Sequence, residues 1–381
     1  MEILKVPQGE FELARYPHRE KETLRAWDAA DEYLLNYFYE EYENTVQDNK
    51  LKILLINDSF GALTTALAKQ HKLTVWNDSW LSQKAIQSNC IHNGVTIENI
   101  EIKNSIETPV DDYDFVLIKT PKSHAMLEDQ LARIKPFLTQ KTHVIAAGMA
   151  KSIHTSTLKL FECYIGSTKT SLAKKKARLI FSQVDKNIPD KKSPYPKNYV
   201  LENTRYKIIN HANVFSRESL DVGTRFFLQH IPQSNEYKKI IDLACGNGVV
   251  GLIAVEKNPN ADILFLDESY MAVASAQENM NLNMENCALV QFEVNDCLSG
   301  VKENSVDLIL NNPPFHQNNV IGDEVAWKMF KQSKQVLKKN GELWVIGNRH
   351  LGYHVKLKRI FNSCEVIITN KKFVILRATK K

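Results

Sequence analysis

Short apolar runs alternate with longer amphipathic segments along the chain, and this alternation predicts strands that are each followed by a helix. Residues 52–57, 73–76, 115–118 and 142–146 are apolar runs of strand length, and a helical pattern covers 62–70. Strands that are apolar on both faces, with helices between them, are typical of a parallel sheet that is covered by helices. The first half of the chain therefore predicts an α/β domain.

The same order of elements returns after residue 200. A strand pattern at 239–243 is followed by a glycine-containing turn and a helical pattern at 249–257. The further patterns lie at 263–266, 272–284, 289–294, 306–310, 327–337 and 342–346, with a hairpin expected over 366–376. Residues 185–199, between the two halves, are rich in Lys and Pro, which is typical of a linker. We therefore expect two domains of the same class.

Charge is spread unevenly over this framework. Residues 1–48 are acidic and aromatic, and they are predicted to be helical because apolar side chains recur at helical spacing over 23–42. Residues 151–200, in contrast, hold 11 basic and 3 acidic side chains. The densest basic cluster consists of Lys169, Lys174, Lys175, Lys176 and Arg178. A solvated surface is the ordinary interpretation of such a cluster, and a surface that contacts RNA phosphates is the alternative.

The composition excludes several classes of protein. With 381 residues, 43% of them apolar and 24% charged, the chain has ordinary globular composition and a length that suggests two domains. No apolar run approaches the ~20 residues of a membrane span, and the first residues show no signal-peptide pattern. Six scattered cysteines without a Cys-x-x-Cys pair indicate reduced thiols in a cytoplasmic protein.

Short motifs of the two halves fall in register, which indicates an ancient duplication. The corresponding positions are 57–61 with 244–248, 77–79 with 267–269, 89 and 93 with 279 and 283, and 114–117 with 307–310. The spacing is too long for a solenoid repeat, so each copy would be a whole domain. Chance similarity between two α/β domains is the alternative interpretation.

The two copies differ at the positions that could carry chemistry. The second copy has Asp, Gly and Asp at positions 242, 246 and 267, where the first has Leu, Ser and Asn at 55, 59 and 77. Lys119 and Lys122 stand in the first copy where the second has Asn312 and Phe315. We therefore expect the first copy to have kept the fold and lost the chemistry, and to use its lysines to contact RNA phosphates.

The segment from Asp242 to Gly251 has the spacing Gly-x-Gly-x-x-Gly at a strand–turn–helix junction, and an acid follows at 267. This spacing is the fingerprint of a dinucleotide-binding dehydrogenase, which is one interpretation. Asp242 opposes it, because a carboxylate at the end of the first strand would repel a pyrophosphate. S-adenosylmethionine fits better, since its amino-acid end can lie near the turn. Asp267 can then accept from its ribose hydroxyls, and residues 295–296 from its adenine amine.

The strand pattern at 306–310 ends in Asn-Asn-Pro-Pro-Phe at 311–315. Proline has no N–H group for a sheet, so the strand must stop there and leave backbone carbonyls free. At the carboxyl end of a strand, the Asn312 oxygen and the Pro313 carbonyl could accept from an amino group on a planar ligand. Phe315 could stack on the ring of that ligand. A loop that only terminates a strand is the alternative interpretation.

These motifs resemble those of class I methyltransferases that modify exocyclic amines of nucleobases. With the segments 210–230 and 347–350, the sequence is similar to the ribosomal RNA guanine-N2 methyltransferases of the RsmC/RlmG family, and it fits the large-subunit branch better. One departure is Ala244, where the family usually has Gly. The resemblance implies two tandem Rossmann-like domains, 1–190 and 191–381, each a mostly parallel seven-stranded sheet with flanking helices. The N-terminal copy is expected to be degenerate and to bind RNA.

The motifs and the resemblance together imply three sets of site residues. S-adenosyl-L-methionine is expected to be held by Phe215, Thr224, Asp242, Ala244, Gly246, Gly248, Asp267, Glu268, Asn295, Asp296 and Asn312. Catalysis is expected from Asn312, Pro313, Pro314 and Phe315. RNA is expected to contact Lys119, Lys122, Lys169, Lys174, Lys175, Lys176 and Arg178. Phe215 is expected to close over the cofactor or the base.

The expected reaction is direct methyl transfer to the N2 of a specific guanine in large-subunit (23S) ribosomal RNA, in the cytoplasm. We expect no membrane, no metal and no obligate protein partner. His350 and His354 lie four residues apart, but they lack the intervening Glu and the third ligand of a metalloprotease site. Three alternatives stay open: a small-subunit ribosomal RNA methyltransferase, a methyltransferase of protein glutamine or a small molecule, and a non-catalytic RNA-binding protein.

Overall fold

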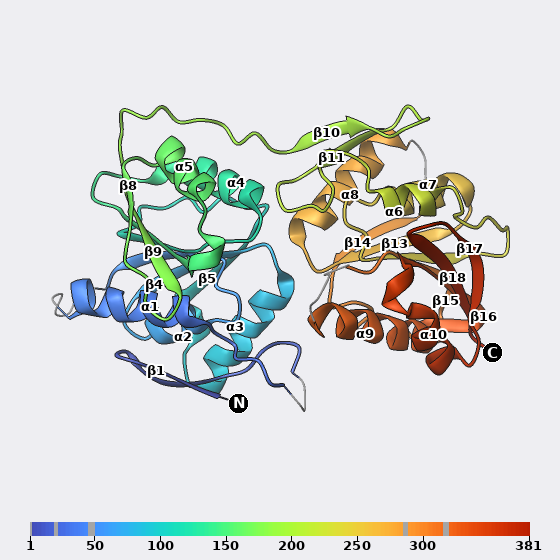
Figure 1. Ribbon diagram of the computed structural model, residues 1–381, viewed down its shortest axis with the longest axis horizontal. Coiled ribbons are helices and arrows are strands. Elements are labelled where there is room, and N and C mark those ends of the chain that lie inside the picture. The colour runs from blue at the N-terminus through green and yellow to red at the C-terminus, as the bar shows by residue number, and fades with distance from the viewer. Residues whose placement is uncertain (1, 19–21, 45–49, 285–288, 315–319) are drawn as a thin grey trace. The chain divides into compact units, whose positions relative to one another are not determined.

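The computed structural model describes residues 2–18, 22–44, 50–284, 289–314 and 320–381 (Figure 1). The chain divides into two compact units, Met1–Tyr195 and Pro196–Lys381, and each is built around its own seven-stranded sheet. Within the described ranges, no helix combines the length and the apolar character needed to cross a bilayer.

Unit 1 begins with a β-hairpin and a helix, and its sheet follows. The hairpin pairs β1 (Glu2–Val6) with β2 (Gly9–Leu13), and α1 (Ala29–Phe38) continues into a π-helical turn at Tyr39–Glu43. The sheet strands are β3 (Lys52–Ile56), β4 (Lys72–Asn77), β5 (Ile100–Asn104), β6 (Phe115–Lys119), β7 (His143–Met149), β8 (Thr168–Thr170) and β9 (Ala177–Gln183). The helices between them are α2 (Ala62–Leu67), α3 (Trp80–His92), α4 (His124–Ile134) and α5 (Thr155–Tyr164).

Unit 2 repeats this plan. A hairpin of β10 (Lys197–Val200) and β11 (Lys207–Asn210) precedes α6 (Val222–Leu228). The sheet strands are β12 (Lys239–Leu243), β13 (Asp262–Asp267), β14 (Val290–Val294), β15 (Val306–Asn311), β16 (Leu337–Asn348), β17 (Glu365–Thr369) and β18 (Phe373–Thr379). The helices are α7 (Val249–Lys257), α8 (Tyr270–Asn283), α9 (Val320–Val336) and α10 (Tyr353–Phe361).

The two sheets have the same strand order. It is β5-β4-β3-β6-β7-β9-β8 in unit 1 and β14-β13-β12-β15-β16-β18-β17 in unit 2. In each sheet the first five strands of that order are parallel, and the strand next to the far edge is antiparallel to both of its neighbours. This arrangement confirms the predicted fold class, in which two α/β domains of the same topology follow one another.

The core of unit 2 has two layers, one on each face of its sheet. Phe227 of α6 and Phe265 of β13 pack with residues of α7 and α8 on one face. Phe330 of α9 and Leu357 of α10 pack against the opposite face, as the separation of these helices across the sheet in Figure 1 shows. Because helices cover both faces, a ligand can reach the sheet at the ends of its strands. In α/β folds, ligands bind at the carboxyl ends of the strands.

Two predictions about secondary structure are wrong. Residues 1–48 were predicted to be helical, but 2–13 form a hairpin and the helix begins only at Ala29. The hairpin forms because its alternating apolar side chains face the core, and α1 starts late because Asp28 caps its first amides. The other error concerns β16, which was expected at 342–346 and already begins at Leu337, with a register shift against β15.

Pairs of asparagines explain why positions 89 and 93 match 279 and 283. In unit 2, the Asn279 amide donates to the Ile209 carbonyl at 2.9 Å and accepts from the Ile209 N–H at 2.6 Å, and Asn283 makes the same pair of bonds with Lys207. In unit 1, residues 89 and 93 bind the backbone of residues 14 and 12 in the same way. The duplication therefore includes the hairpins, whose strands the sequence patterns did not reveal.

Replacing Asn279 by alanine is expected to lower the free energy of unfolding of unit 2 by roughly 2–4 kcal/mol, because it removes three hydrogen bonds and leaves buried backbone groups unpaired. The third bond runs from Asn279 to the Asn247 carbonyl, at 2.9 Å, in the turn that precedes α7. Urea denaturation measures the change. The control is Asn281→Ala, at an exposed position of the same helix. An equal loss of stability in both variants would contradict a stabilising role for the three hydrogen bonds of Asn279.

Candidate active site

The turn between β12 and α7 has an unusual backbone. Ala244, Gly246 and Gly248 adopt positive φ angles of 60°, 54° and 75°. A Cβ at Gly248 would lie 2.7 Å from the Ala276 Cβ, so this position requires glycine for close helix packing. A Cβ at Gly246, in contrast, would meet no atom within 4 Å. The structure therefore leaves open space beside the Gly246 backbone, where a ligand can approach closely.

Asp242, in β12, stabilises the helix start that follows this turn. Its carboxylate is 2% exposed and accepts from the Gly251 N–H at 2.7 Å, in the first turn of α7. Burial, together with the nearby Asp267, raises the pKa of this carboxyl to about 7, although the hydrogen bond from Gly251 opposes the rise. The structure thus shows Asp242 holding the helix start, and its predicted contact with the cofactor stays a prediction. Burial also raises the pKa of the Cys245 thiol well above its usual value, so this cysteine is not an activated nucleophile.

Asp267 forms hydrogen bonds with the segments that follow the two neighbouring strands, β12 and β14. One carboxylate oxygen accepts from the Gly246 N–H at 3.0 Å, and the other accepts from the Ser269 N–H at 3.1 Å. The Asp267 carbonyl accepts from the Asn295 N–H at 2.8 Å, which brings the segment after β14 to the same place. Glu268 is half-buried beside it. The predicted ribose and adenine contacts therefore come from residues that lie side by side at the carboxyl edge of the sheet.

Asp296 has a partner that the sequence did not reveal. Its side chain is 8% exposed, and one oxygen accepts a hydrogen bond from the Lys328 ammonium on α9. The two residues are 32 positions apart, so no local spacing signals the pair. Lys328 neutralises Asp296, which leaves the other carboxylate oxygen as a further acceptor at this edge.

A relay of polar groups orients the Asn312 amide at the end of β15. The Asp221 carboxylate accepts from the Thr224 hydroxyl at 3.3 Å, and the Thr224 oxygen accepts from the Asn312 Nδ2 at 3.0 Å. Because the hydroxyl proton points to Asp221, the Thr224 oxygen is left as an acceptor and selects the nitrogen end of the amide. The Asn312 Oδ1 is buried and has no hydrogen-bond partner among the residues that the structure describes.

The neighbours of Asn312 complete the strand end. Asn311 is fully buried and donates from Nδ2 to the Leu243 carbonyl at 2.8 Å, which fixes the end of β15 against the end of β12. Pro313 is buried and Pro314 is exposed. Phe315 lies outside the described residues, so its predicted stacking role stays a prediction. Phe215, in the loop before α6, is 65% exposed, as a side chain that covers a ligand could be.

The matching region of unit 1 keeps the turn but fills it differently. Asn57 and Gly61 have positive φ angles of 64° and 87°, like their counterparts 244 and 248, whereas Ser59 does not share the positive φ of Gly246. Asp58 is 1% exposed and accepts from the Thr64 N–H at 2.8 Å, the amide that corresponds to that of Gly251. A carboxylate from the turn itself thus replaces the one from the strand and holds the start of the helix.

Lys119 occupies the position of Asn312 in unit 1, and the structure corrects its predicted role. Its ammonium lies 2.8 Å from a carboxylate oxygen of both Asp28 and Asp31, and the side chain is 12% exposed. Burial raises the pKa of Asp31 to about 6, whereas Lys119 lowers the pKa of Asp28 and has its own pKa raised by the two carboxylates. A lysine neutralised by two carboxylates has no free charge for an RNA phosphate.

The other predicted RNA contacts lie on the surface of unit 1. Lys175 and Lys176 form the two-residue turn of the β8–β9 hairpin with positive φ angles of 47° and 64°, the conformation of a tight hairpin turn. Lys174 lies 5.0 Å from the centre of the Tyr33 ring, and Lys175 pairs with Glu32 at 2.8 Å while its side chain stays 77% exposed. The remaining exposed members of the set are Lys122, Lys169 and Arg178.

Comparisons with known proteins agree with this geometry. The model of an RLMG N-terminal domain matches residues 1–186, and that of a methyltransferase small domain matches 205–377. The ribosomal RNA large subunit methyltransferase G of Pseudoalteromonas translucida is 48% identical over 97% of this chain and 96% of its own. The protein of that name from Psychromonas ingrahamii is 47% identical over 100% and 99%.

The chain belongs to the ribosomal RNA large subunit methyltransferase G family. A solved structure of similar fold is the T. thermophilus 16S rRNA N2 methyltransferase RsmC, in complex with AdoMet and guanosine. It is 18% identical, covers 100% of this chain and 98% of its own, and has a TM-score of 0.77. The fold of the family therefore extends over both units.

Membership of this family makes the chain a methyltransferase that uses S-adenosyl-L-methionine. The residues of unit 2 fit that cofactor, because the turn is open beside Gly246, while Asp267 and Asp296 offer carboxylate oxygens for hydroxyl and amino groups. Unit 1 lacks this combination, since its turn holds the buried Asp58 and has no glycine at position 59. Over the described ranges, no group of three or more His, Cys, Asp or Glu could hold a metal ion.

Proposed function

We propose that unit 2 transfers the methyl group of S-adenosylmethionine to the exocyclic N2 of a specific guanine in large-subunit (23S) ribosomal RNA, in the cytoplasm. The observation that carries the proposal is the Asn312 amide, whose nitrogen is fixed by Thr224 and whose buried oxygen has no partner in the described structure. An unpaired buried acceptor costs roughly 1–3 kcal/mol, which a bound amino group would recover.

In this proposal, Asn312 and the backbone after it position the target nitrogen. The Asn312 Oδ1 and the Pro313 carbonyl each accept one N–H of the guanine amine, and this aims the nitrogen lone pair at the methyl group that the sulfonium of the cofactor supplies. As the new N–C bond forms, the C–S bond breaks and S-adenosylhomocysteine is the leaving group, while the proton that the amine loses passes to water. The nitrogen is only weakly basic, so alignment is expected to supply most of the rate enhancement.

A guanine in a duplex cannot place its N2 in a buried pocket, so we propose that the base is flipped out of its helix or comes from a single-stranded region. The names of the relatives favour large-subunit ribosomal RNA as the substrate. The guanosine in the RsmC complex supports guanine as the base. A methyltransferase of protein glutamine could use the same asparagine, but it would not need the exposed lysines of the β8–β9 hairpin.

The experiment that tests this proposal is the transfer of tritiated methyl groups onto purified ribosomal RNA from cells that lack the protein. Incorporation into large-subunit RNA, without incorporation into small-subunit RNA or ribosomal proteins, supports it. Incorporation into small-subunit RNA alone would favour the small-subunit alternative. Labelling of protein alone, or of neither RNA, would contradict an RNA substrate.

We further propose that unit 1 binds RNA and not the cofactor, with the basic hairpin as its contact. The tip of this hairpin lies at the carboxyl end of β7, because Ala177 pairs with Met149, and this is the edge where the sheet of unit 2 has its site. In unit 1, the buried Asp58 lies in the turn that matches residues 244–248, and Lys119 with its two carboxylates stands at the position of Asn312. These differences favour the exposed lysines of the hairpin as the contact with a partner.

Changing Lys174, Lys175 and Lys176 together to glutamine is expected to raise the KM for RNA and to reduce the slope of log affinity against log salt by about 0.7–0.9 per lost phosphate contact. Affinity for S-adenosylmethionine should not change. Filter binding of large-subunit RNA over a salt series measures both the affinity and the slope. The control is the triple glutamine variant of Lys69, Lys72 and Lys141, which are exposed near the other edge of the same sheet. An unchanged slope in the hairpin variant would identify the cluster as a solvated surface.

A further inference from the structure

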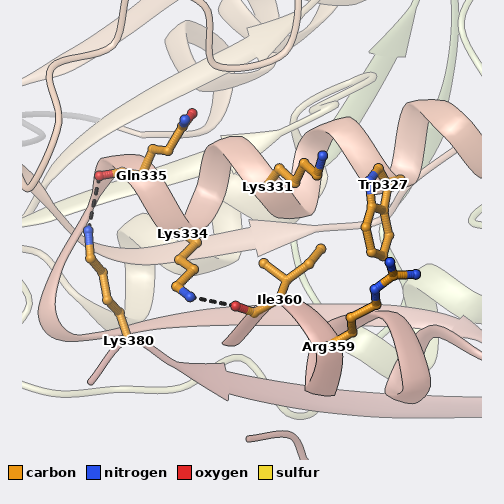
Figure 2. Close-up of a pocket in the computed structure, with 7 residues that line it drawn as sticks. All are labelled: Trp327, Lys331, Lys334, Gln335, Arg359, Ile360 and Lys380. Carbon is orange, nitrogen blue, oxygen red and sulfur yellow. Dashed lines mark hydrogen bonds between the residues drawn. The ribbon is translucent and has the colours of Figure 1, made fainter. Parts of the chain in front are cut away.

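A basic groove runs between α9 and α10 on one face of unit 2, and its lining includes neither Asn312 nor the residues of the β12–α7 turn. It is a hollow of about 610 Å³. Figure 2 shows Trp327, Lys334 and Arg359 directed into the space between the two helices. The lining residues are Trp327, Lys331, Lys334, Gln335, Arg359, Ile360 and Lys380. Its described lining includes no acidic side chain. A smaller hollow shares Trp327 and Arg359, and Glu324, Val355 and Lys356 also line it.

Among the residues that the structure describes, the four cations of the groove form no salt bridge with an acid. The Lys334 ammonium donates to the Ile360 carbonyl at 2.6 Å, and that of Lys380 donates to the Asn304 Oδ1 at 2.8 Å and the Gln335 carbonyl at 3.1 Å. Within the part of the chain that the structure describes, neither Lys331 nor Arg359 forms a salt bridge. Concentrated charge of one sign in a groove attracts an anionic partner.

Trp327 lies at one end of this basic groove. Its ring is half-buried, and the Lys331 Nζ and the Arg359 Cζ both lie 5.5 Å from its centre. Figure 2 shows the Arg359 guanidinium directly beside the edge of the ring. An aromatic ring among cations matches a nucleotide, since the base can stack on the ring while its phosphate contacts the cations. An acidic peptide would satisfy the cations but would not need the ring.

The groove is connected to the active site through the helices that form it. α9 leads away from the end of β15, where Asn312 lies, and α10 leads away from the end of the parallel strand β16. Both helices therefore begin at the carboxyl edge of the sheet. Trp327 is seven residues from the start of α9, which is about 10 Å along the helix axis.

We propose that the α9–α10 groove binds the single-stranded RNA that flanks the target guanine, with one base stacked on Trp327 and the backbone phosphates held by Lys331 and Arg359. This inference rests on the proposed function, because the flanking strand exists only if RNA is the substrate. It assigns to unit 2 its own RNA-binding surface, so that substrate recognition does not depend on unit 1 alone.

The first test neutralises the charge. The double variant Lys331→Gln with Arg359→Gln is expected to bind large-subunit RNA at least about 10-fold more weakly in moderate salt, and to lose about 1.4 from the salt slope, as two lost contacts to a single strand require. Its affinity for S-adenosylmethionine should stay the same. The matched control is Arg205→Gln with Lys207→Gln, which also removes one Arg and one Lys from exposed positions. These positions lie around β11, which is hydrogen-bonded to α8 on the other face of the sheet.

The second test removes the ring. Trp327→Ala is expected to raise the KM for RNA by about 5- to 100-fold, the range for loss of one stacked base, whereas Trp327→Phe should restore most of the affinity. Thermal denaturation and cofactor affinity of both variants report whether the fold is retained. If Trp327→Phe is as defective as Trp327→Ala, the ring serves packing only and the stacking is wrong.

The outcomes separate this inference from the function on which it rests. If the unchanged protein methylates no RNA, the proposed function fails. If the unchanged protein methylates RNA and the charge variant matches the control in affinity, slope and KM, the groove inference fails. If the charge variant methylates naked RNA normally but loses activity on ribosomal particles, the groove binds a ribosomal protein, and its assignment to RNA is overturned.

Discussion

Replacing Asn312 by alanine is expected to lower the kcat of methyl transfer by about 10²- to 10³-fold while the affinity for S-adenosylmethionine stays nearly the same. The variant removes the acceptor that aligns the target amine, and it leaves intact the turn at 244–248 and the carboxylate of Asp267. Single-turnover methylation of large-subunit RNA measures the rate, and calorimetry measures cofactor affinity.

The control for this variant is Asn235→Ala, which changes an exposed asparagine of unit 2 in the loop before β12, at the amino end of the strands. It should methylate at the normal rate. Activity of Asn312→Ala within a few-fold of the unchanged protein would mean that the amine is aligned by other groups. Loss of cofactor affinity in the same variant would place Asn312 against the cofactor and not the base.

Replacing Asp267 by alanine is expected to weaken the binding of S-adenosylmethionine by about 10- to 100-fold. A hydrogen bond to a charged acceptor is worth roughly 1.5–3 kcal/mol, and the substitution also frees the Gly246 N–H that Asp267 now holds at 3.0 Å. Calorimetry gives the affinity, and for the unchanged protein it should give one molecule of cofactor per chain.

The duplication supplies a matched control for Asp267. Asn77 stands at the corresponding position of unit 1, where its amide donates to the Asp58 carbonyl at 3.0 Å. Asn77→Ala should leave cofactor affinity unchanged, because unit 1 is expected to hold no cofactor. Two equivalent sites per chain, or an equal loss of affinity in both variants, would contradict the assignment of the cofactor to unit 2.

The sequence predicted the main sheets because their parallel strands are buried on both faces and leave uninterrupted apolar runs. It predicted the carboxyl-edge residues of unit 2 for a related reason. The glycines at 246 and 248 and the prolines at 313 and 314 mark the points where strands must end, and parallel strands end at one edge. The turn, the acid at 267 and Asn312 could therefore be placed together without the structure.

The contacts between distant residues could not be predicted in the same way. Lys119 was expected to contact RNA because it stands where the second copy has Asn312, but its partners Asp28 and Asp31 lie far earlier in the chain, at the start of α1. The relay to Asn312 likewise depends on Asp221 and Thr224, which are 91 and 88 residues away. The hairpins β1–β2 and β10–β11 were missed because each is short and is held in part by asparagines much later in the chain.

The measurement that tests the central claim most directly is nucleoside analysis by mass spectrometry. Large-subunit RNA from cells that lack the protein is incubated with the full chain and isotopically labelled S-adenosylmethionine, and is then digested to nucleosides. The account predicts that the label appears as N2-methylguanosine, at one residue per RNA molecule, and that it is absent when Asn312→Ala replaces the unchanged protein. Label in any other nucleoside, or equal labelling by the two proteins, would contradict the account.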